Sequence, residues 1–402
     1  MQLITEMSLP HLPVDDPEFH RDPMPFVEAA RRQHPWLAKF NSGYVIHGYQ
    51  ALQDLAFMDD KLEMGLASVV DFYQARGTPW ARFMLEMMQS KTGDEHKRLR
   101  GSVAQAFTPK SANQVRPLMR RVISELLDEW APKREFDFAD FAAFFPVTVL
   151  CGILGVSAKP IPGLRSAIEN YMNLFTLDPA LRSKCLAAYD ELYEFVDALV
   201  KEREKSGAIG EDGLLDKLIA SKNAGGIDDT ELRFLILDLL IAGYDTSKNM
   251  LTLTVHMLLQ YPDYWVRCAN DYEFCGKVVE EMLRHSGIAT TFRSVKEDFD
   301  YEGHRFPKNT LIAFATPLAG RDPAAFQDPM RFDPERVSAN RHLAFGRGEH
   351  ICLGQHLARA QLQEGLHLIA QRLRNPKLAG AVTWRPFLGA WGLRTLPIRF
   401  EI

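Results

Sequence analysis

One cysteine of the chain stands among glycines, a setting that suits a metal-bound thiolate. The segment runs Phe345-Gly346-Arg347-Gly348-Glu349-His350-Ile351-Cys352-Leu353-Gly354. Glycines let the backbone pass close to a flat ligand and point N–H groups at a sulfur atom. Because such donors stabilise an anionic sulfur, Cys352 suits the axial position of a haem iron. A lone cysteine is more commonly a small buried side chain. A zinc site of His350, Cys352 and His356 is another alternative, but it lacks a fourth ligand nearby.

A second pattern places a carboxylate beside a hydroxyl inside an apolar helix. The helix begins after Asp228, which forms a predicted capping box with Glu231, and it ends before Pro262. In its middle stands Ala242-Gly243-Tyr244-Asp245-Thr246. Glycine and such polar groups are costly in a helix interior, so the segment is either a tolerated kink or a functional site.

Two further patterns place charged side chains on helical faces. His96 and Arg100 lie four residues apart, and Glu281 and Arg284 lie three apart, so each pair shares one face. Taken singly, each pair is equally typical of a solvated surface helix.

Together these segments resemble the cytochrome P-450 family. The cysteine segment fills every fixed position of the family's haem-binding signature, Phe-Gly-x-Gly-x-His-x-Cys-x-Gly. The resemblance implies haem b with the Cys352 thiolate as its axial ligand, surrounded by Phe345, Gly346 and Gly354. It also implies that the haem propionates bind cationic partners, namely His96, Arg100, Arg293 and His350, with His342 as a further candidate.

The other landmarks of the family follow in order along the chain. Glu281-Met282-Leu283-Arg284 and the later Pro329-Met330-Arg331-Phe332 resemble the segments that supply a buried charged triad, which implies that Glu281, Arg284 and Arg331 anchor the haem-loop region. Ala242 to Thr246 resembles the oxygen-activation motif. By resemblance, Thr246 holds bound dioxygen and a water, Asp245 relays protons, and Gly243 leaves room above the iron.

The resemblance implies a haem-thiolate monooxygenase that oxidises a hydrophobic small molecule, such as a terpenoid, steroid, fatty acid or aromatic compound, with O2. The expected substrate pocket is mostly apolar and includes Leu240, Ile241, Ile288, Ala289, Thr290, Thr291 and Trp391. The alternatives are a peroxide-driven peroxygenase, a haem isomerase or dehydratase, and a non-catalytic haem-thiolate sensor or electron carrier. The intact Asp245-Thr246 pair argues against all three.

We expect the electrons to come from a separate protein, because neither a flavin domain nor a cysteine cluster is seen after the haem segment in this sequence. Between His96 and Arg121 the chain carries seven cations and no acid: Lys97, Arg98, Arg100, Lys110, Arg116, Arg120 and Arg121. This basic segment fits an acidic ferredoxin, with its ferredoxin reductase, or a flavodoxin. A solvated face is the equally weighted alternative.

Composition narrows the class of protein. The 402 residues carry a net charge of −5 and are 46% hydrophobic, which is typical of a globular protein and makes nucleic-acid binding over the whole surface unlikely. Five irregularly spaced cysteines favour a reducing cytoplasm over a disulfide framework. The longest apolar run, 141–156, contains Pro146 and is too short to span a bilayer, so we expect a buried helix and no membrane anchor.

The elements that must position these residues are mainly helical. Residues 94–285 show apolar side chains at three- and four-residue spacing. A hairpin is predicted over 36–47, and the alternation of Leu396, Ile398, Phe400 and Ile402 predicts a final strand. We therefore expect one cytochrome P-450 domain over 1–402, mainly α, with β-rich portions at about 36–60, 293–318 and 380–402.

Overall fold

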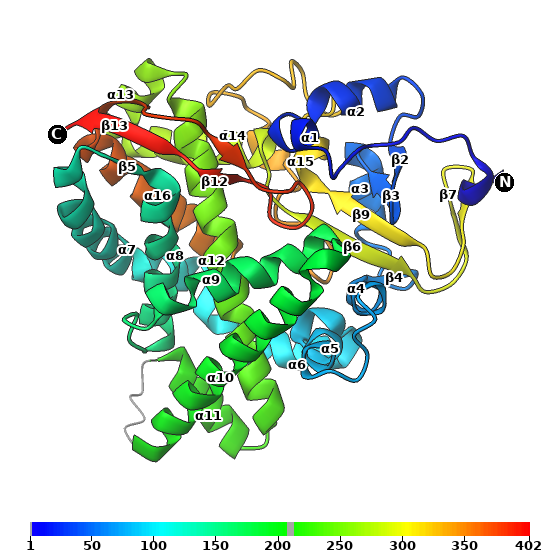
Figure 1. The fold of residues 1–402 in the computed structure, drawn as a ribbon, viewed down its shortest axis with the longest axis horizontal. Helices are drawn as coiled ribbons and strands as arrows, with labels where there is room; N and C mark the ends of the chain where they lie inside the picture. The colour runs from blue at the N-terminus through cyan, green and yellow to red at the C-terminus, as the bar shows by residue number, and fades with distance from the viewer. Residues whose placement is uncertain (1, 207–212) are drawn as a thin grey trace.

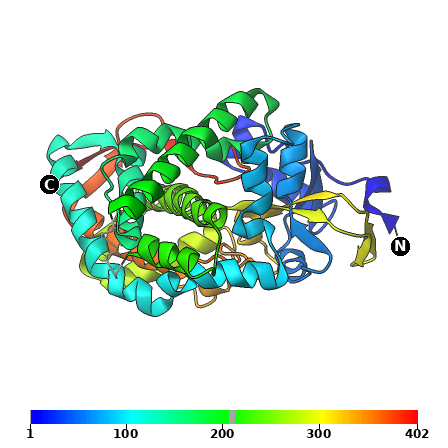
Figure 2. The ribbon, with the colours of Figure 1, turned by 90° about the horizontal axis from the view of Figure 1, so that it is seen from below.

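The predicted long helix forms the central element of the fold. The computed structural model of the protein describes residues 2–206 and 213–402, and in it helix α12 (Asp229–Leu258) crosses the middle of the molecule (Figure 1). The capping box is present, because the Asp228 side chain accepts from the Glu231 backbone and Glu231 accepts from the backbone of Asp228. Seen from below, α12 runs end-on through the centre, between a helical part and the main sheet (Figure 2).

Helices make up most of the described chain, which confirms the predicted fold class. Helices α7, α8 and α16 lie on one side of α12, and α9, α10 and α11 pack near its N-terminal half. The bounds of the other helices are α1 Pro17–Arg21, α2 Met24–Arg31, α3 Tyr49–Leu55, α4 Leu66–Phe72, α5 Pro79–Glu86, α6 Gly93–Ala104, α7 Pro109–Trp130, α8 Phe138–Leu154, α9 Ile161–Met172, α10 Arg182–Ser206, α11 Leu214–Asn223, α13 Pro262–Asn270, α14 Tyr272–His285, α15 Thr316–Ala319 and α16 Gln355–Arg372.

The largest sheet lies on the other side of α12 and has five strands in the order β2-β3-β9-β6-β4. Strands β2 and β3 form the predicted hairpin, with Phe40 opposite Gly43. The bounds of the strands are β1 Gln2–Leu3, β2 Leu37–Phe40, β3 Gly43–Ile46, β4 Leu62–Met64, β5 Glu135–Asp137, β6 Thr290–Val295, β7 Phe299–Tyr301, β8 His304–Phe306, β9 Leu311–Ala315, β10 Arg374–Leu378, β11 Thr383–Trp384, β12 Leu393–Thr395 and β13 Pro397–Glu401.

The predicted β-rich portions are correct in place but not in extent. Of the portion 36–60 only 37–46 is strand, because residues 49–55 form α3, which buries Leu52 and Leu55. In the final strand Ile398 and Phe400 are buried as the alternation predicts. Strand β5 lies inside the region predicted as helical, where it pairs with β13, a partner far away in the sequence.

The apolar run 141–156 lies in α8 as far as Leu154, and this helix buries twelve residues and continues through Pro146. This confirms the prediction of a buried helix. Across residues 2–206 and 213–402, the structure holds no helix of sufficient length and apolarity to traverse a bilayer.

Candidate active site

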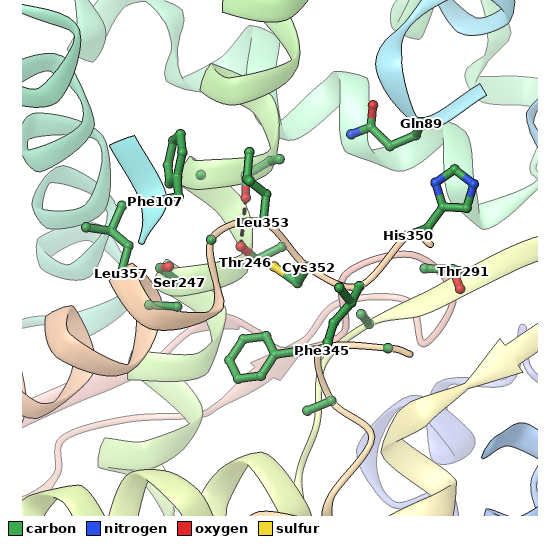
Figure 3. Close-up of a pocket in the computed structure, with 18 of the residues that line it drawn as sticks. Gln89, Phe107, Thr246, Ser247, Thr291, Phe345, His350, Cys352, Leu353 and Leu357 are labelled. Carbon is green, nitrogen blue, oxygen red and sulfur yellow. Dashed lines mark hydrogen bonds between the residues drawn. The ribbon is translucent and has the colours of Figure 1, made fainter. Parts of the chain in front are cut away.

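One large cavity lies between the cysteine loop and the middle of α12. Its lining includes Cys352 from the loop, Thr246 from α12 and Thr291 from β6 (Figure 3). The cavity volume is about 330 Å³. Ordinary ligand pockets occupy roughly 300–1,000 Å³, so the hollow is large enough to hold a small-molecule ligand.

The cysteine loop needs glycine at two positions. The backbone N–H of Cys352 donates to the carbonyl of Phe345 at 2.8 Å, which closes the loop. Gly346 and Gly348 adopt φ values of +69° and +74°, in the left-handed region that favours glycine. At Gly348 a Cβ atom would also lie 2.2 Å from the carbonyl oxygen of Ala56. The predicted glycine roles therefore have a conformational basis.

The sulfur of Cys352 faces the cavity just before α16 begins. Burial raises the pKa of the Cys352 thiol, whereas the backbone N–H groups of Gly354 and Gln355 and the nearby guanidiniums of Arg100 and Arg359 act in the opposite direction. These donors favour an anionic sulfur, and a bound metal ion deprotonates a coordinating thiol outright. The setting thus fits a thiolate ligand to a metal.

A charged cluster fixes the loop from behind. The Arg359 guanidinium lies 4.5 Å from the centre of the Phe345 ring, and its Nε donates to Glu280 at 2.5 Å. Burial alone would raise the pKa of Glu280, but hydrogen bonds from His342 and Arg359 lower it to about 2. His342 contacts Glu280 at 3.3 Å and does not line the cavity, so its predicted role as a propionate partner is wrong.

The four other predicted propionate partners meet at one corner of the cavity. His96, Arg100, Arg293 and His350 all line it, and the rings of His96 and His350 lie 4.7 Å apart. Burial lowers the pKa of Arg293 to about 10, and burial and then Arg293 lower the pKa of His350 to about 3. Within the described ranges no carboxylate forms an ion pair with Arg293. The guanidiniums of Arg100 and Arg293, with the two imidazoles as hydrogen-bonding groups, fit an anionic ligand group.

One face of α12 forms the opposite wall. The residues of α12 that line the cavity recur at helical spacing and include Thr246, whose Oγ1 donates to the carbonyl of Ala242 at 2.8 Å; Figure 3 shows this bond. The full set is Asp238, Leu239, Ala242, Gly243, Thr246, Ser247 and Met250. This spacing places the face toward the cavity because 3.6 residues complete one turn.

Asp245 lies on a different face of α12 from Thr246. It is fully buried, does not line the cavity, and accepts a hydrogen bond from Arg385 Nη1. Burial alone would lower the pKa of Arg385, but the Asp245 carboxylate reverses the effect and raises it. Gly243 does line the cavity, yet a Cβ there would lie 2.9 Å from Leu150 Cδ2, so it also lets α12 approach α8 closely.

The predicted substrate-pocket residues divide into two groups. Ile288, Ala289 and Thr291 line the cavity as predicted, whereas Leu240, Ile241, Thr290 and Trp391 are buried elsewhere and the prediction for them is wrong. The reason is periodicity: Leu240 and Ile241 fall off the cavity face of α12, and alternate residues of β6 point to opposite faces of the sheet. Trp391 instead donates through Nε1 to the carbonyl of His20 at 2.7 Å.

The predicted charged triad has a different third member. Arg284 binds Glu281 with two hydrogen bonds of 2.8 and 2.7 Å, and both side chains are fully buried. Arg331 is wrong as their partner, because its side chain is 68% exposed and reaches only Asp333. Arg336 takes the place, with its Nε 3.3 Å from Glu281 Oε1.

Arg331 contributes only its backbone carbonyl, which accepts from Arg284 and Arg336. The sequence signal for Arg336 is the turn after Asp333, whose carbonyl accepts from the Arg336 backbone N–H at 3.0 Å and turns the arginine back toward Glu281.

Sequence reasoning missed several residues of the cavity. Asp238 and Leu239 follow from Thr246 by counting back two helical turns, so the spacing offered a signal. Met88, Gln89 and Phe107 come from short 3-10 segments that carry no comparable pattern. Of the metal-ligand types in the described ranges, Asp59, Glu349 and His350 are the one group of three that converges, so the zinc alternative with Cys352 and His356 is not assembled.

Comparisons with known proteins agree with this site. The family model described as Cytochrome P-450 matches residues 164–379. Luteothin monooxygenase of Streptomyces thioluteus is 33% identical over 398 residues, which cover 98% of this chain and 96% of that protein. The 6-deoxyerythronolide B hydroxylase of Saccharopolyspora erythraea is 30% identical over 372 residues, which cover 89% of this chain and 90% of that protein.

A solved structure matches over nearly the same length. The cytochrome P-450 enzyme CxnD, described as acting in C–S bond formation in chuangxinmycin biosynthesis, superposes with a TM-score of 0.83 at 28% identity, over 94% of each chain. The similarity therefore covers the cysteine loop, α12 and the sheet together.

Proposed function

Since this chain belongs to the cytochrome P-450 family and is a monooxygenase, we propose that it binds haem b through Cys352 and oxidises a hydrophobic small organic substrate. The observation that carries the proposal is the shared cavity, in which Cys352, the cationic corner and Thr246 face one hollow. Haem held by a cysteine thiolate supplies the activation of molecular oxygen and its insertion into a substrate C–H bond.

The residues of this chain hold the cofactor in place and support its sulfur ligand. Gly354 and Gln355 direct N–H groups at the Cys352 sulfur and so favour its anionic form, against the effect of burial. His96, Arg100, Arg293 and His350 hold the two propionates and so fix the orientation of the cofactor. The Glu281–Arg284–Arg336 cluster is buried behind the loop and holds its approach segment in place.

Thr246 and Asp245 have separate roles in the proposed proton transfer. Thr246 projects into the cavity, where its hydroxyl would hold a water and pass on a proton. Asp245 is buried behind it and delivers protons only after its carboxylate leaves Arg385. Asp245 would therefore take two positions, one paired with Arg385 and one released from it.

The substrate lies in an apolar space. The wall between β6 and α12 is formed by Ile288, Ala289, Leu239 and Met250. Relatives named for acting on luteothin and 6-deoxyerythronolide B support a small organic substrate. Such walls bind through the area they remove from water, about 25 cal/mol per Å².

The thiolate ligand is tested by the spectrum of the reduced carbon-monoxide complex. Wild-type protein should show the far-shifted Soret band of a thiolate-bound complex, and Cys352→Ser should lose it. Cys151→Ser is the matched control, since Cys151 is buried in α8 away from the cavity. A normal band in Cys352→Ser would overturn the assignment.

The reaction class is tested by Thr246→Ala. A monooxygenase should then divert electrons into hydrogen peroxide and lose product, by roughly 10²-fold for a lost proton-transfer residue. A peroxide-driven peroxygenase or a sensor should be unaffected. Thr254→Ala serves as the control, because Thr254 Oγ1 also bonds the backbone of α12, at 2.7 Å to Met250, but lies outside the cavity.

We also propose an acidic ferredoxin, with its reductase, or a flavodoxin as the electron donor. The structure reduces the number of cations in the basic segment that are available to a partner. Arg116 and Arg120 both bind the buried carboxylate of Glu364, at 3.1 and 2.8 Å. Lys110 is exposed, and no carboxylate of the described residues pairs with it. Lys110→Glu should slow reduction by the ferredoxin in a salt-dependent way, whereas Lys308→Glu, exposed beside β8, should not. Equal reduction rates for wild type and Lys110→Glu would exclude the surface around Lys110 as the docking site of the electron donor.

A further inference from the structure

The cavity holds a buried carboxylate that the proposed chemistry does not use. Asp238 is 4% exposed and lines the cavity on α12, eight residues before Thr246. Two helical turns separate the two side chains, which is about 12 Å along the axis. Gln89, in the 3-10 segment Met88–Ser90, donates through Nε2 to Asp238 Oδ1 at 2.6 Å. Gln89 is among the cavity-lining side chains drawn in Figure 3.

This pair presents an acceptor that lacks a donor. Gln89 Oε1 is buried and has no hydrogen-bond partner in the part of the chain that the structure describes. Burial raises the pKa of Asp238 to about 7, and only the Gln89 hydrogen bond opposes it, so no neighbouring cation offsets the burial of the carboxyl group. A buried acceptor without a donor costs about 1–3 kcal/mol, so the pair is incomplete by itself.

No side chain of the described residues donates a hydrogen bond to Gln89 Oε1. The titratable side chain that Asp238 influences is Tyr171 of α9, which is fully buried and directs its hydroxyl at the sulfur of Met84, at 3.2 Å. The nearest charged residue on its own helix, Arg233, is bound to Asp197 and Asp229. A donor on a molecule in the cavity would complete the pair.

We propose that Asp238 and Gln89 anchor a hydrogen-bond donor of the substrate, a hydroxyl or an amine, at the end remote from the oxidised carbon. The inference rests on the proposed function and refines it: the substrate is an apolar molecule with one polar end, and its two ends lie about two helical turns apart. A wholly apolar substrate would bury the same acceptor unpaired and bind more weakly.

Three imidazoles with ten-carbon chains test this anchor on the full-length, haem-loaded enzyme. The probes are 1-decylimidazole, 1-(10-hydroxydecyl)imidazole and 1-(10-aminodecyl)imidazole, which end in a methyl, hydroxyl or amino group. Imidazole binding to the iron shifts the Soret band, so dissociation constants are read without turnover. We expect the hydroxyl or the amine probe to bind about tenfold more tightly than the methyl probe, which corresponds to about 1.4 kcal/mol.

Substitutions assign the preference to these residues. Asp238→Leu should abolish it, and Asp238→Asn should retain a hydroxyl preference but lose an amine preference, because only the carboxylate offers a countercharge. Gln89→Leu should reduce the preference about threefold. Because Gln89 lies in a short segment outside α12, this variant tests the anchor even if the Asp238 variants fail to fold. Thr254→Val removes a hydroxyl from the same helix but outside the cavity and should leave the preference unchanged.

The outcomes separate the two proposals. If no probe shifts the Soret band, the haem assignment itself fails. If all three probes shift it with equal affinity, the haem site stands and the anchor is overturned. A preference that persists in Asp238→Leu also overturns the anchor, whereas its loss there, with retention in Thr254→Val, supports it.

Discussion

Arg385 binds Asp245 on the side of α12 that turns away from the cavity. The guanidinium reaches the helix from the segment after β11, donates to Asp245 Oδ1, and lies 3.4 Å from Asn249 Oδ1. The second oxygen of Asp245 is buried without a partner in the described residues. The acid of the proposed proton relay is therefore half of a buried ion pair, and the proposed relay requires this pair to open.

Arg385→Leu should leave the Asp245 carboxylate buried without a countercharge. We expect a loss of about 3 kcal/mol in the free energy of unfolding, the usual cost of removing one partner of a buried pair. The double variant Arg385→Leu/Asp245→Asn should regain most of that loss, because the unpaired charge is gone. Denaturant titration measures both. Additive losses in the double variant would show that the two side chains do not interact.

Arg336 and Arg331 form a matched pair for the buried triad. Arg336→Ala should cost about 1–3 kcal/mol, since it removes a charged donor from the buried Glu281. Arg331→Ala should change stability by less than about 0.5 kcal/mol, as is usual for an exposed side chain. Urea unfolding of the two variants compares them directly, and the reverse order of effects would restore the assignment to Arg331.

Arg293 should control how tightly the cofactor is held. Its buried guanidinium has no carboxylate partner in the described ranges and faces the corner proposed for the propionates. Arg293→Ala should speed transfer of haem to a competing apoprotein by about tenfold or more, as expected for a lost charge-assisted hydrogen bond. Arg305→Ala, half-exposed on β8, provides a control of equal charge change. Unchanged transfer in Arg293→Ala would place the propionates elsewhere.

Gly348 and Gly346 differ in what surrounds them. Both have positive φ, so alanine at either position costs about 1 kcal/mol in backbone conformation. At Gly348 the new methyl would also meet the carbonyl of Ala56, whereas nothing lies within 4 Å at Gly346. Gly348→Ala should therefore lower the haem content of purified protein much more than Gly346→Ala. Equal retention in both variants would contradict the close approach.

Asp238 should make stability fall as the pH rises. Its pKa is about 7 in the folded protein against an ordinary value of 3.8, so the folded state binds more protons between those values. Ionisation of Asp238 then costs up to about 1.4 kcal/mol per pH unit, and the cost levels off above pH 7. The melting temperature of Asp238→Asn relative to wild type should rise from pH 5.5 to pH 8. A constant difference would mean that Asp238 is ionised throughout.

Local patterns in the sequence predicted the parts of the site that adjacent residues define. The glycines of the cysteine loop permit its positive φ angles, and the Asp228–Glu231 box forms within one turn, so both can be recognised from adjacent residues. Helical spacing likewise predicted α12, its length and its apolar environment. These features follow from short-range geometry, which a linear sequence contains.

The tertiary structure decided which side chains of those elements meet. Whether Asp245 faces the cavity depends on the rotation of α12 about its axis, which packing against α8 and Arg385 sets. The choice of Arg336 over Arg331 depends on how one turn folds back on Glu281. The bond between Gln89 and Asp238 joins positions 149 residues apart. No local propensity encodes such pairings, because they arise only when separate elements pack and each buried polar group must find its partner.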